Sequence, residues 1–171
     1  SSYLEETVLG GWGGGNQPSA PALPEQLREK TPQDDHALFQ LVTAATPQSV
    51  RVAVGLTFSQ WLDTHKADRE GRTEWVVGSN GRITGWLGLT HRRLETKAEV
   101  LVHPDNPGLW EDLVECALVR EGPVRWLVPE YQELVASLLL RRGFREVAQY
   151  NLLIKTLAVL VVERRMAPME A

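Results

Sequence analysis

The stretch of residues 99–119 holds side chains suited to acid–base chemistry. Glu99 lies in a run of strand-like alternation, and the two-residue period places its carboxylate on the face opposite Ala98 and Val100. A carboxylate on such a strand can act as a general base. His103 offers a second base that would act through a water. The structural alternatives are a Glu99 paired with a nearby arginine and a histidine that only forms part of a turn.

A turn rich in proline and glycine follows this run and leads into an amphipathic helix pattern. The free N–H groups at the start of such a helix commonly bind phosphate. Here Asp105, Glu111 and Asp112 place negative charge beside those groups, which opposes an anion and stabilises the helix end without one. The sequence leaves open a phosphate site and a helix end that satisfies itself.

The composition narrows the class of protein. A chain of 171 residues can bury the core of one domain, and its net charge of −4 without a basic face argues against a nucleic-acid partner. Cys116 is the only cysteine, which excludes an internal disulfide and fits a reducing cytoplasm, where we expect the protein. No signal peptide opens the chain, and the apolar run at 157–162 is too short to span a membrane, so we expect no membrane partner. No metal-ligand spacing is present, and we expect no metal.

The hydrophobic pattern predicts the order β-α-α-β-β-β-α-β-α-β from residue 27 on. Thr31 and Thr46 are predicted to begin two helices, the second running past Gly55 to Trp61 with a break or kink at that glycine. Asn80-Gly81 predicts a hairpin, and a further strand is predicted at 96–104. A helix, a short buried strand, a helix ended by a glycine, and a closing strand or strand pair at 145–162 complete the order.

The beginning of the chain reads differently. Residues 9–24 are rich in glycine, proline and serine without periodicity, which predicts a flexible linker. Residues 2–9 before it read as a strand or a short helix. We therefore divide the chain into a leader or remnant of a preceding segment at 1–26, a domain at 27–160 and a tail at 161–171.

The element order and three local stretches resemble the GNAT superfamily of N-acyltransferases. Residues 27–41 resemble its opening strand and first helix, residues 99–114 its fourth strand, V-x-P motif and pyrophosphate loop, and residues 138–157 its last helix with Gly-Phe and the next strand. The resemblance covers about residues 27–160. It implies an α/β fold with a mixed, largely antiparallel sheet flanked by helices on both faces.

In that family acetyl-CoA lies between the fourth and fifth strands, which splay apart, and its pyrophosphate rests on the N-terminus of the next helix. An amine attacks the thioester directly, and a carboxylate or an ordered water removes its proton. The resemblance implies Glu99 as the catalytic base. It also implies acetyl-CoA as co-substrate, bound by the fourth strand and the loop and helix start after it: Leu101, Val102, Gly108, Leu109 and Trp110.

The sequence departs from the family at two places. Only Gly108 remains of the loop glycines, and Leu139 stands where the family has a tyrosine that protonates the leaving thiolate; Tyr131 is a distant substitute. Two hypotheses follow: an N-acetyltransferase acting on a small-molecule or peptide amine with a degenerate pyrophosphate loop, and a catalytically inactive GNAT-derived binding or regulatory module. The sequence leaves open a homodimer and a preceding domain.

Overall fold

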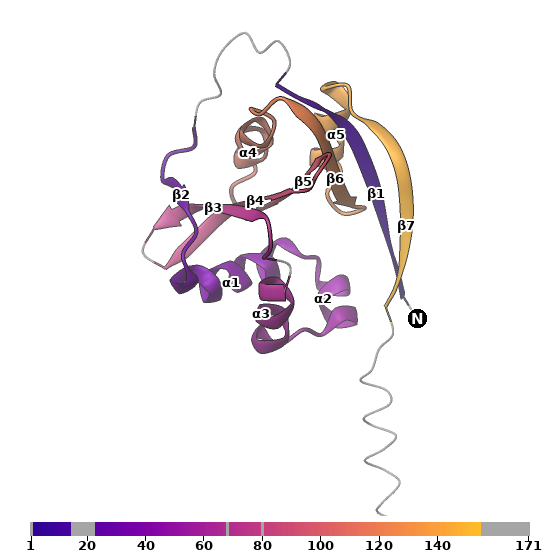
Figure 1. The fold of residues 1–171 in the computed structure, drawn as a ribbon. Coiled ribbons are helices and arrows are strands. Elements are labelled where there is room, and N and C mark those ends of the chain that lie inside the picture. Colours follow the sequence, from indigo (N-terminus) through magenta and orange to yellow (C-terminus); the bar gives the residue numbers. More distant parts are fainter. Residues whose placement is uncertain (1, 15–22, 68, 80, 155–171) are drawn as a thin grey trace, which may run out of the picture.

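The computed structural model describes residues 2–14, 23–67, 69–79 and 81–154 (Figure 1). Within them, seven strands form one sheet in the order β2-β3-β4-β5-β6-β1-β7, and only the β5–β6 pair is parallel. The strands are β1 (Ser2–Gly13), β2 (Leu27–Glu29), β3 (Arg72–Ser79), β4 (Arg82–His91), β5 (Thr96–Val102), β6 (Gly122–Pro129) and β7 (Arg145–Ile154).

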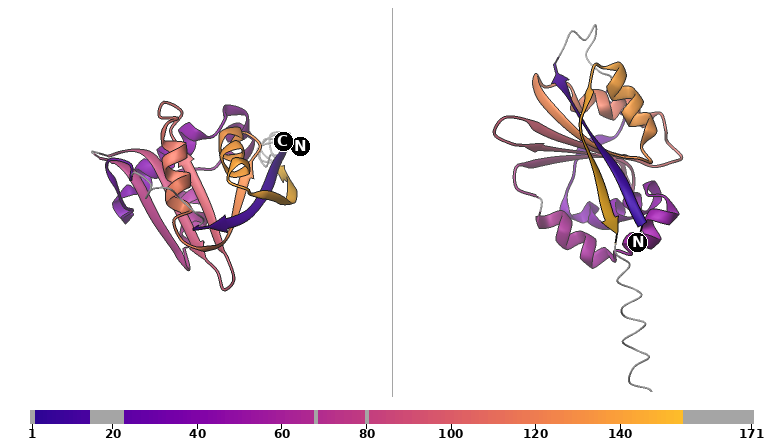
Figure 2. Two further views of the ribbon diagram at one scale, coloured as in Figure 1. Left: turned by 90° about the horizontal axis from the view of Figure 1, so that it is seen from above. Right: turned by 90° about the vertical axis from the view of Figure 1, so that its right-hand side faces the viewer.

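Helices cover both faces of this sheet, as predicted (Figures 1 and 2). One apolar core lies under α4 (Leu109–Ala117) and α5 (Glu133–Arg141), and Cys116 packs partly buried against it. The second core lies on the face covered by three further helices and contains buried side chains of the first and third of them. These are α1 (Asp35–Ala45), α2 (Gln48–Val54) and α3 (Phe58–Ala67), with a 3-10 turn η1 (Pro32–Asp34) before α1. None of the described helices is long and apolar enough to cross a membrane.

Local signals predicted some of the helix ends. The Thr31 N–H donates to the Asp34 carboxylate at 2.8 Å in a capping box that begins η1 and α1. Gly55 ends α2 with a φ of 58°, so the predicted break is confirmed. The prediction that Thr46 caps the second helix is wrong, because Thr46 is the C-cap of α1 and Pro47 is the N-cap of α2.

The first strand, β1, corrects the interpretation of the N-terminal segment. It lies between β6 and β7 and is antiparallel to both, so the prediction of a flexible linker at 9–24 is wrong for residues 9–13. The glycines serve close packing here: a Cβ at Gly11 would lie 2.5 Å from the Phe144 ring, and one at Gly13 2.3 Å from the Arg120 carbonyl oxygen. Residues 15–22 and the predicted tail at 161–171 lie outside the described residues.

Candidate functional site

The parallel strands β5 and β6 separate part-way along their length. They pair at three positions, Thr96 with Val124, Lys97 with Arg125 and Ala98 with Trp126, and no further pair is formed between the two strands as described. Beyond Ala98, β5 stays paired with β4 and β6 stays paired with β1. The facing edges of β5 and β6 therefore present backbone N–H and C=O groups without a strand partner.

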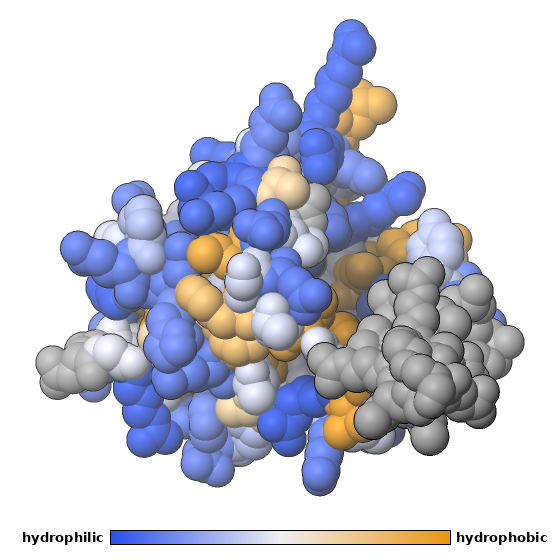
Figure 3. All heavy atoms as spheres, turned by 90° about the horizontal axis from the view of Figure 1, so that it is seen from below, coloured by the Kyte–Doolittle hydropathy of each residue, from blue (hydrophilic) through white to orange (hydrophobic). Residues whose placement is uncertain are grey.

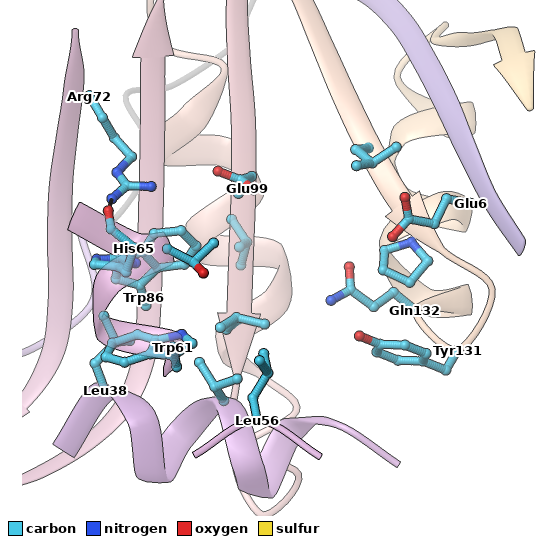
Figure 4. Close-up of a pocket in the computed structure, with 16 residues that line it drawn as sticks. Glu6, Leu38, Leu56, Trp61, His65, Arg72, Trp86, Glu99, Tyr131 and Gln132 are labelled. Carbon is cyan, nitrogen blue, oxygen red and sulfur yellow. Dashed lines mark hydrogen bonds between the residues drawn. The ribbon is translucent and has the colours of Figure 1, made fainter. Parts of the chain in front are cut away.

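A hollow of about 290 Å³ opens at this separation. Glu6, Tyr131 and Gln132 reach in from one side, and Glu99 projects from β5 (Figure 4). The opposite wall is aromatic: Trp61, His65 and Trp86 (Figure 4). Polar groups that converge in an apolar hollow are the usual form of a small-molecule site.

The alternation of β5 directs Glu99 into this hollow. Ala98, Val100 and Val102 are buried under α4 and α5, whereas Glu99 and Leu101 lie on the opposite face, as the two-residue period predicted. The Glu99 carboxylate lies 3.9 Å from the Lys97 ammonium group. Its side chain is 33% exposed, so it is accessible to a ligand in the hollow.

Glu6 brings a second carboxylate from β1. Burial raises the pKa of this carboxyl; Lys97 lowers it, and the charge of Glu99 raises it again, with a raised pKa as the net result. A carboxylate with a raised pKa is a stronger base at neutral pH. Two carboxylates facing one hollow also favour a cation between them, because a positive charge relieves their repulsion.

Tyr131 is held between the hollow and α1. Burial raises the pKa of its phenol, a hydrogen bond with Thr46 lowers it, and the charge of Glu6 raises it; the net pKa is raised. The Tyr131 hydroxyl therefore keeps its proton at neutral pH and can donate it. Gln132 follows it directly and is buried.

A buried ion-pair network fixes the aromatic wall. Glu74 Oε1 accepts a hydrogen bond from Trp86 Nε1 at 3.1 Å, and His65 Nε2 lies 2.7 Å from the same oxygen, out of line for a hydrogen bond. Arg72 donates to the His65 carbonyl at 2.5 Å. Burial would raise the pKa of Glu74, but His65, Arg72 and Lys30 outweigh it and lower that pKa. The positive charges on this wall are thus already engaged with Glu74.

Comparison with solved structures identifies the fold. No family model and no curated protein matches the sequence. A GCN5-related N-acetyltransferase structure from Sphaerobacter thermophilus is similar at 19% identity and a TM-score of 0.60, over 88% of this chain and 51% of that one. An acetyltransferase of the GNAT family from Colwellia psychrerythraea has 9% identity and a TM-score of 0.58, over 88% and 56%. The chain has the GNAT fold. It spans about half the length of these two structures.

In the GNAT fold, β5 and β6 correspond to the fourth and fifth strands, between which the resemblance implied the arm of acetyl-CoA. The unpaired edge of β5 after Ala98 fits that arm, because it leaves backbone donors and acceptors for the amides of a pantetheine group. Leu101 lines the hollow on this strand, whereas Val102 is buried in the core on the other face.

The N-terminus of α4 fits the pyrophosphate of a GNAT ligand poorly. The Leu109 N–H donates to the Asn106 carbonyl at 3.1 Å, and the Trp110 N–H to the Pro107 carbonyl at 3.3 Å. Gly108 keeps an open approach, since a Cβ there would meet nothing within 4 Å. Two acids, Glu111 and Asp112, lie in the first turn. This helix end has few free donors for an anion.

The Asp105 side chain does not cap the N-terminus of α4. Its N–H donates to His103 Nδ1 at 3.1 Å, its carboxylate lies 3.7 Å from the same nitrogen, and α4 has no side-chain cap. The backbone carbonyl groups of the turn, rather than the Asp105 carboxylate, accept the hydrogen bonds of the Leu109 and Trp110 N–H groups. His103 therefore acts in the turn, as the structural alternative held, and does not line the hollow.

Several residues that line the hollow at Glu99 were not recognised as site residues from the sequence. Glu6 was assigned to a leader, and only its pairing with distant strands brings it to the site. Tyr131 was placed as a distant substitute, although it lies directly in the turn after β6 and beside the gap. Leu139, at the position of the family tyrosine, is fully buried in the core. Among the described residues no group of His, Cys, Asp or Glu could hold a metal ion.

Proposed function

We propose that this protein is an acyl-CoA-dependent N-acyltransferase that transfers an acetyl group to a primary amine by direct attack on the thioester. The observation that carries the proposal is the separation of β5 and β6 after Ala98, which opens unpaired backbone edges onto a hollow with two carboxylates and a tyrosine. The GNAT fold supports it, although a fold alone does not establish an activity.

Each group of the hollow has a role in this proposal. The free edge of β5 holds the acyl arm by backbone hydrogen bonds, which places the thioester beside Glu99. Glu99 and Glu6 act as a pair that accepts the proton of the amine while its nitrogen bonds to the acyl carbon. The Tyr131 hydroxyl gives a proton to the sulfur as the carbon–sulfur bond breaks. Acetyl-CoA supplies the activated acyl group.

A second function is favoured by a specific observation at α4. Because Leu109 and Trp110 already donate to turn carbonyls and two acids follow them, this helix end is not prepared for a diphosphate. An inactive binding or regulatory module derived from a GNAT enzyme would need no diphosphate site. An active enzyme would instead hold its acyl donor mainly through the β5 edge, with weaker affinity for the nucleotide part.

Thermal unfolding with and without acetyl-CoA separates the two functions. At a hundredfold excess over Kd, binding adds about 2.7 kcal/mol to the free energy of unfolding, which raises Tm by roughly 5–10 °C in a domain of this size. The transferase proposal predicts this shift with acetyl-CoA and a smaller one with 3′,5′-ADP, which lacks the pantetheine arm. The absence of any shift at millimolar acetyl-CoA favours the inactive module.

A further inference from the structure

A second hollow continues the first across the helical layer. Its volume is about 650 Å³, and it shares four lining residues with the hollow at Glu99. The shared residues, which border both hollows, are Val42, Leu56, Trp61 and Tyr131. We call this second hollow the α1–α2 groove, since α1, α2 and the segment between α2 and α3 line it.

The α1–α2 groove is apolar and open. Val52 is 71% exposed, Val54 42% and Leu56 47%, and no described part of the chain covers them. Seen from below, apolar side chains gather on this side of the molecule among polar ones (Figure 3). α2 contributes no buried residue to the core, so its apolar side chains face the groove and solvent. A surface of this kind marks a binding site for apolar groups.

The charged groups make the two ends of the combined cavity chemically different. Its inner end carries the carboxylates of Glu6 and Glu99, which outnumber the ammonium group beside them, that of Lys97 at 3.9 Å from Glu99. The basic groups on the facing wall, His65 and Arg72, lie against Glu74. A ligand that fills both parts must therefore be positive at one end and apolar along the rest. An anion at the inner end would meet two carboxylates and the Lys97 ammonium group, so one like charge stays uncompensated, at a cost on the order of 1 kcal/mol at a solvated site.

We propose that the acceptor is a primary amine with an apolar tail. Its ammonium group binds between Glu6 and Glu99 and gives one proton to this pair before the neutral amine attacks, and its tail extends past Trp61 and Tyr131 into the α1–α2 groove. This inference rests on the proposed function and names its substrate class. Trp61 and Tyr131 lie where tail and amine meet, so an aromatic or aliphatic tail is favoured over a polar one.

Binding of straight-chain amines tests the inference without any turnover. Calorimetric titration with propylamine, pentylamine and octylamine in the absence of acetyl-CoA should show Kd falling about three- to fourfold for each added CH₂. Octylamine should bind at least tenfold more tightly than octanol and more tightly still than octanoate. Equal affinity for the three octyl compounds, or no dependence on chain length, would overturn the inference.

Two matched variants locate the tail. Val54→Asp places a charge in the α1–α2 groove and should reduce the octylamine-to-propylamine affinity ratio at least tenfold. Val147→Asp is the control, because Val147 is 55% exposed on β7 and lies outside both hollows. The octylamine-to-propylamine affinity ratio of this variant should equal that of the unmodified protein. Equal ratios in Val54→Asp and the unmodified protein would contradict the placement of the tail. Far-ultraviolet circular dichroism verifies that both variants fold.

The outcomes also separate this inference from the proposed function. If acetyl transfer proceeds with the same kcat/KM for amines of every chain length, the proposed transferase activity is supported and the proposal of an apolar acceptor is wrong. Amine binding that depends on chain length, without transfer from acetyl-CoA, removes the transferase and keeps the groove as a ligand site. A preference for octanoyl-CoA over acetyl-CoA would place an acyl chain in the groove and overturn the inference. Absent octylamine binding, with a dimer that Val54→Asp dissociates, would show that a second copy covers it.

Discussion

The carboxyl groups of Glu6 and Glu99 interact across one hollow, although they come from β1 and β5, strands that are not neighbours in the sheet. Burial raises the pKa of Glu6, the Lys97 ammonium lowers it in part, and the charge of Glu99 raises it, so that the net pKa is raised. β6 lies between the two strands and is paired with β5 only as far as Trp126, so both carboxylates reach the space that the separation leaves. The pair explains why the hollow favours a cation and a proton transfer.

Replacing Glu6 separates catalysis from stability. Glu6→Gln should lower kcat/KM about 10²- to 10⁴-fold, the range of a lost general base, while the acetyl-CoA affinity stays unchanged. Because the pKa of Glu6 is higher in the folded than in the unfolded chain, its ionisation costs stability above the folded pKa, and this cost vanishes as pH falls below the unfolded pKa. Urea unfolding should show Glu6→Gln more stable than the unmodified protein at pH 7 and equally stable near pH 4.

The control for this prediction is Glu146→Gln, which changes an exposed glutamate on β7. It should alter neither kcat/KM nor the pH dependence of stability. A Glu6→Gln variant that keeps full activity would remove Glu6 from the proton path and leave Glu99 as the only carboxylate there.

Tyr131 should affect the chemical step rather than binding. Tyr131→Phe removes the hydroxyl and should lower kcat about 10²-fold, with KM for acetyl-CoA unchanged. Since the phenol pKa is raised, the unmodified protein should keep its activity up to pH 10, and the loss of activity above that pH should be absent in the variant. Tyr150→Phe, at an exposed position on β7, is the matched control. Equal kcat values for both variants would contradict the role of Tyr131.

The Arg28–Asp34 pair should govern acid stability. Two hydrogen bonds of 2.8 and 2.7 Å from Arg28 lower the pKa of Asp34 to about 2. The difference from the ordinary value of 3.8 corresponds to about 2 kcal/mol, present above pH 4 and lost as pH falls through 2. Asp34→Asn should lower the free energy of unfolding by about that amount at pH 7, and exposed Asp63→Asn by less than 0.5 kcal/mol. Equal stabilities of the two variants at pH 7 would contradict this account.

The glycines of β1 test whether this strand belongs to the folded sheet. Gly11→Ala drives a methyl group into the buried Phe144 ring and should cost about 1–3 kcal/mol of unfolding free energy. Gly10→Ala meets Val147 Cγ1 at 3.1 Å, and that exposed side chain can yield, so its cost should stay below 1 kcal/mol. If both substitutions are neutral in urea unfolding, β1 is not packed as described.

Local patterns were sufficient where the determining contacts are local. The alternation around Glu99 predicted which face of β5 it occupies, and the capping sequence at Thr31 predicted the start of the first helices. Gly143, with a φ of 87°, ends the last helix as expected. Each of these features depends on a few neighbouring residues, so the sequence shows it directly.

Features that depend on distant partners could not be predicted in this way. Glycines 10, 11 and 13 read as a linker, because the sequence does not show that Phe144 and Arg120 pack against their backbone. Glu6 reaches the site because β1 pairs with β6 and β7, whose residues lie more than a hundred positions away in the sequence. The same holds for Tyr131, whose position beside the gap depends on where β5 and β6 part.

Turnover tests the central claim most directly. The protein is incubated with acetyl-CoA and primary amines of increasing chain length, and free thiol and acetylated amine are measured by colorimetry and mass spectrometry. The account predicts enzyme-dependent acetylamine in equal amount to the released thiol, reduced at least 10²-fold in the Glu6→Gln/Glu99→Gln double variant. No product above the uncatalysed rate with any amine, or undiminished product in the double variant, would contradict it.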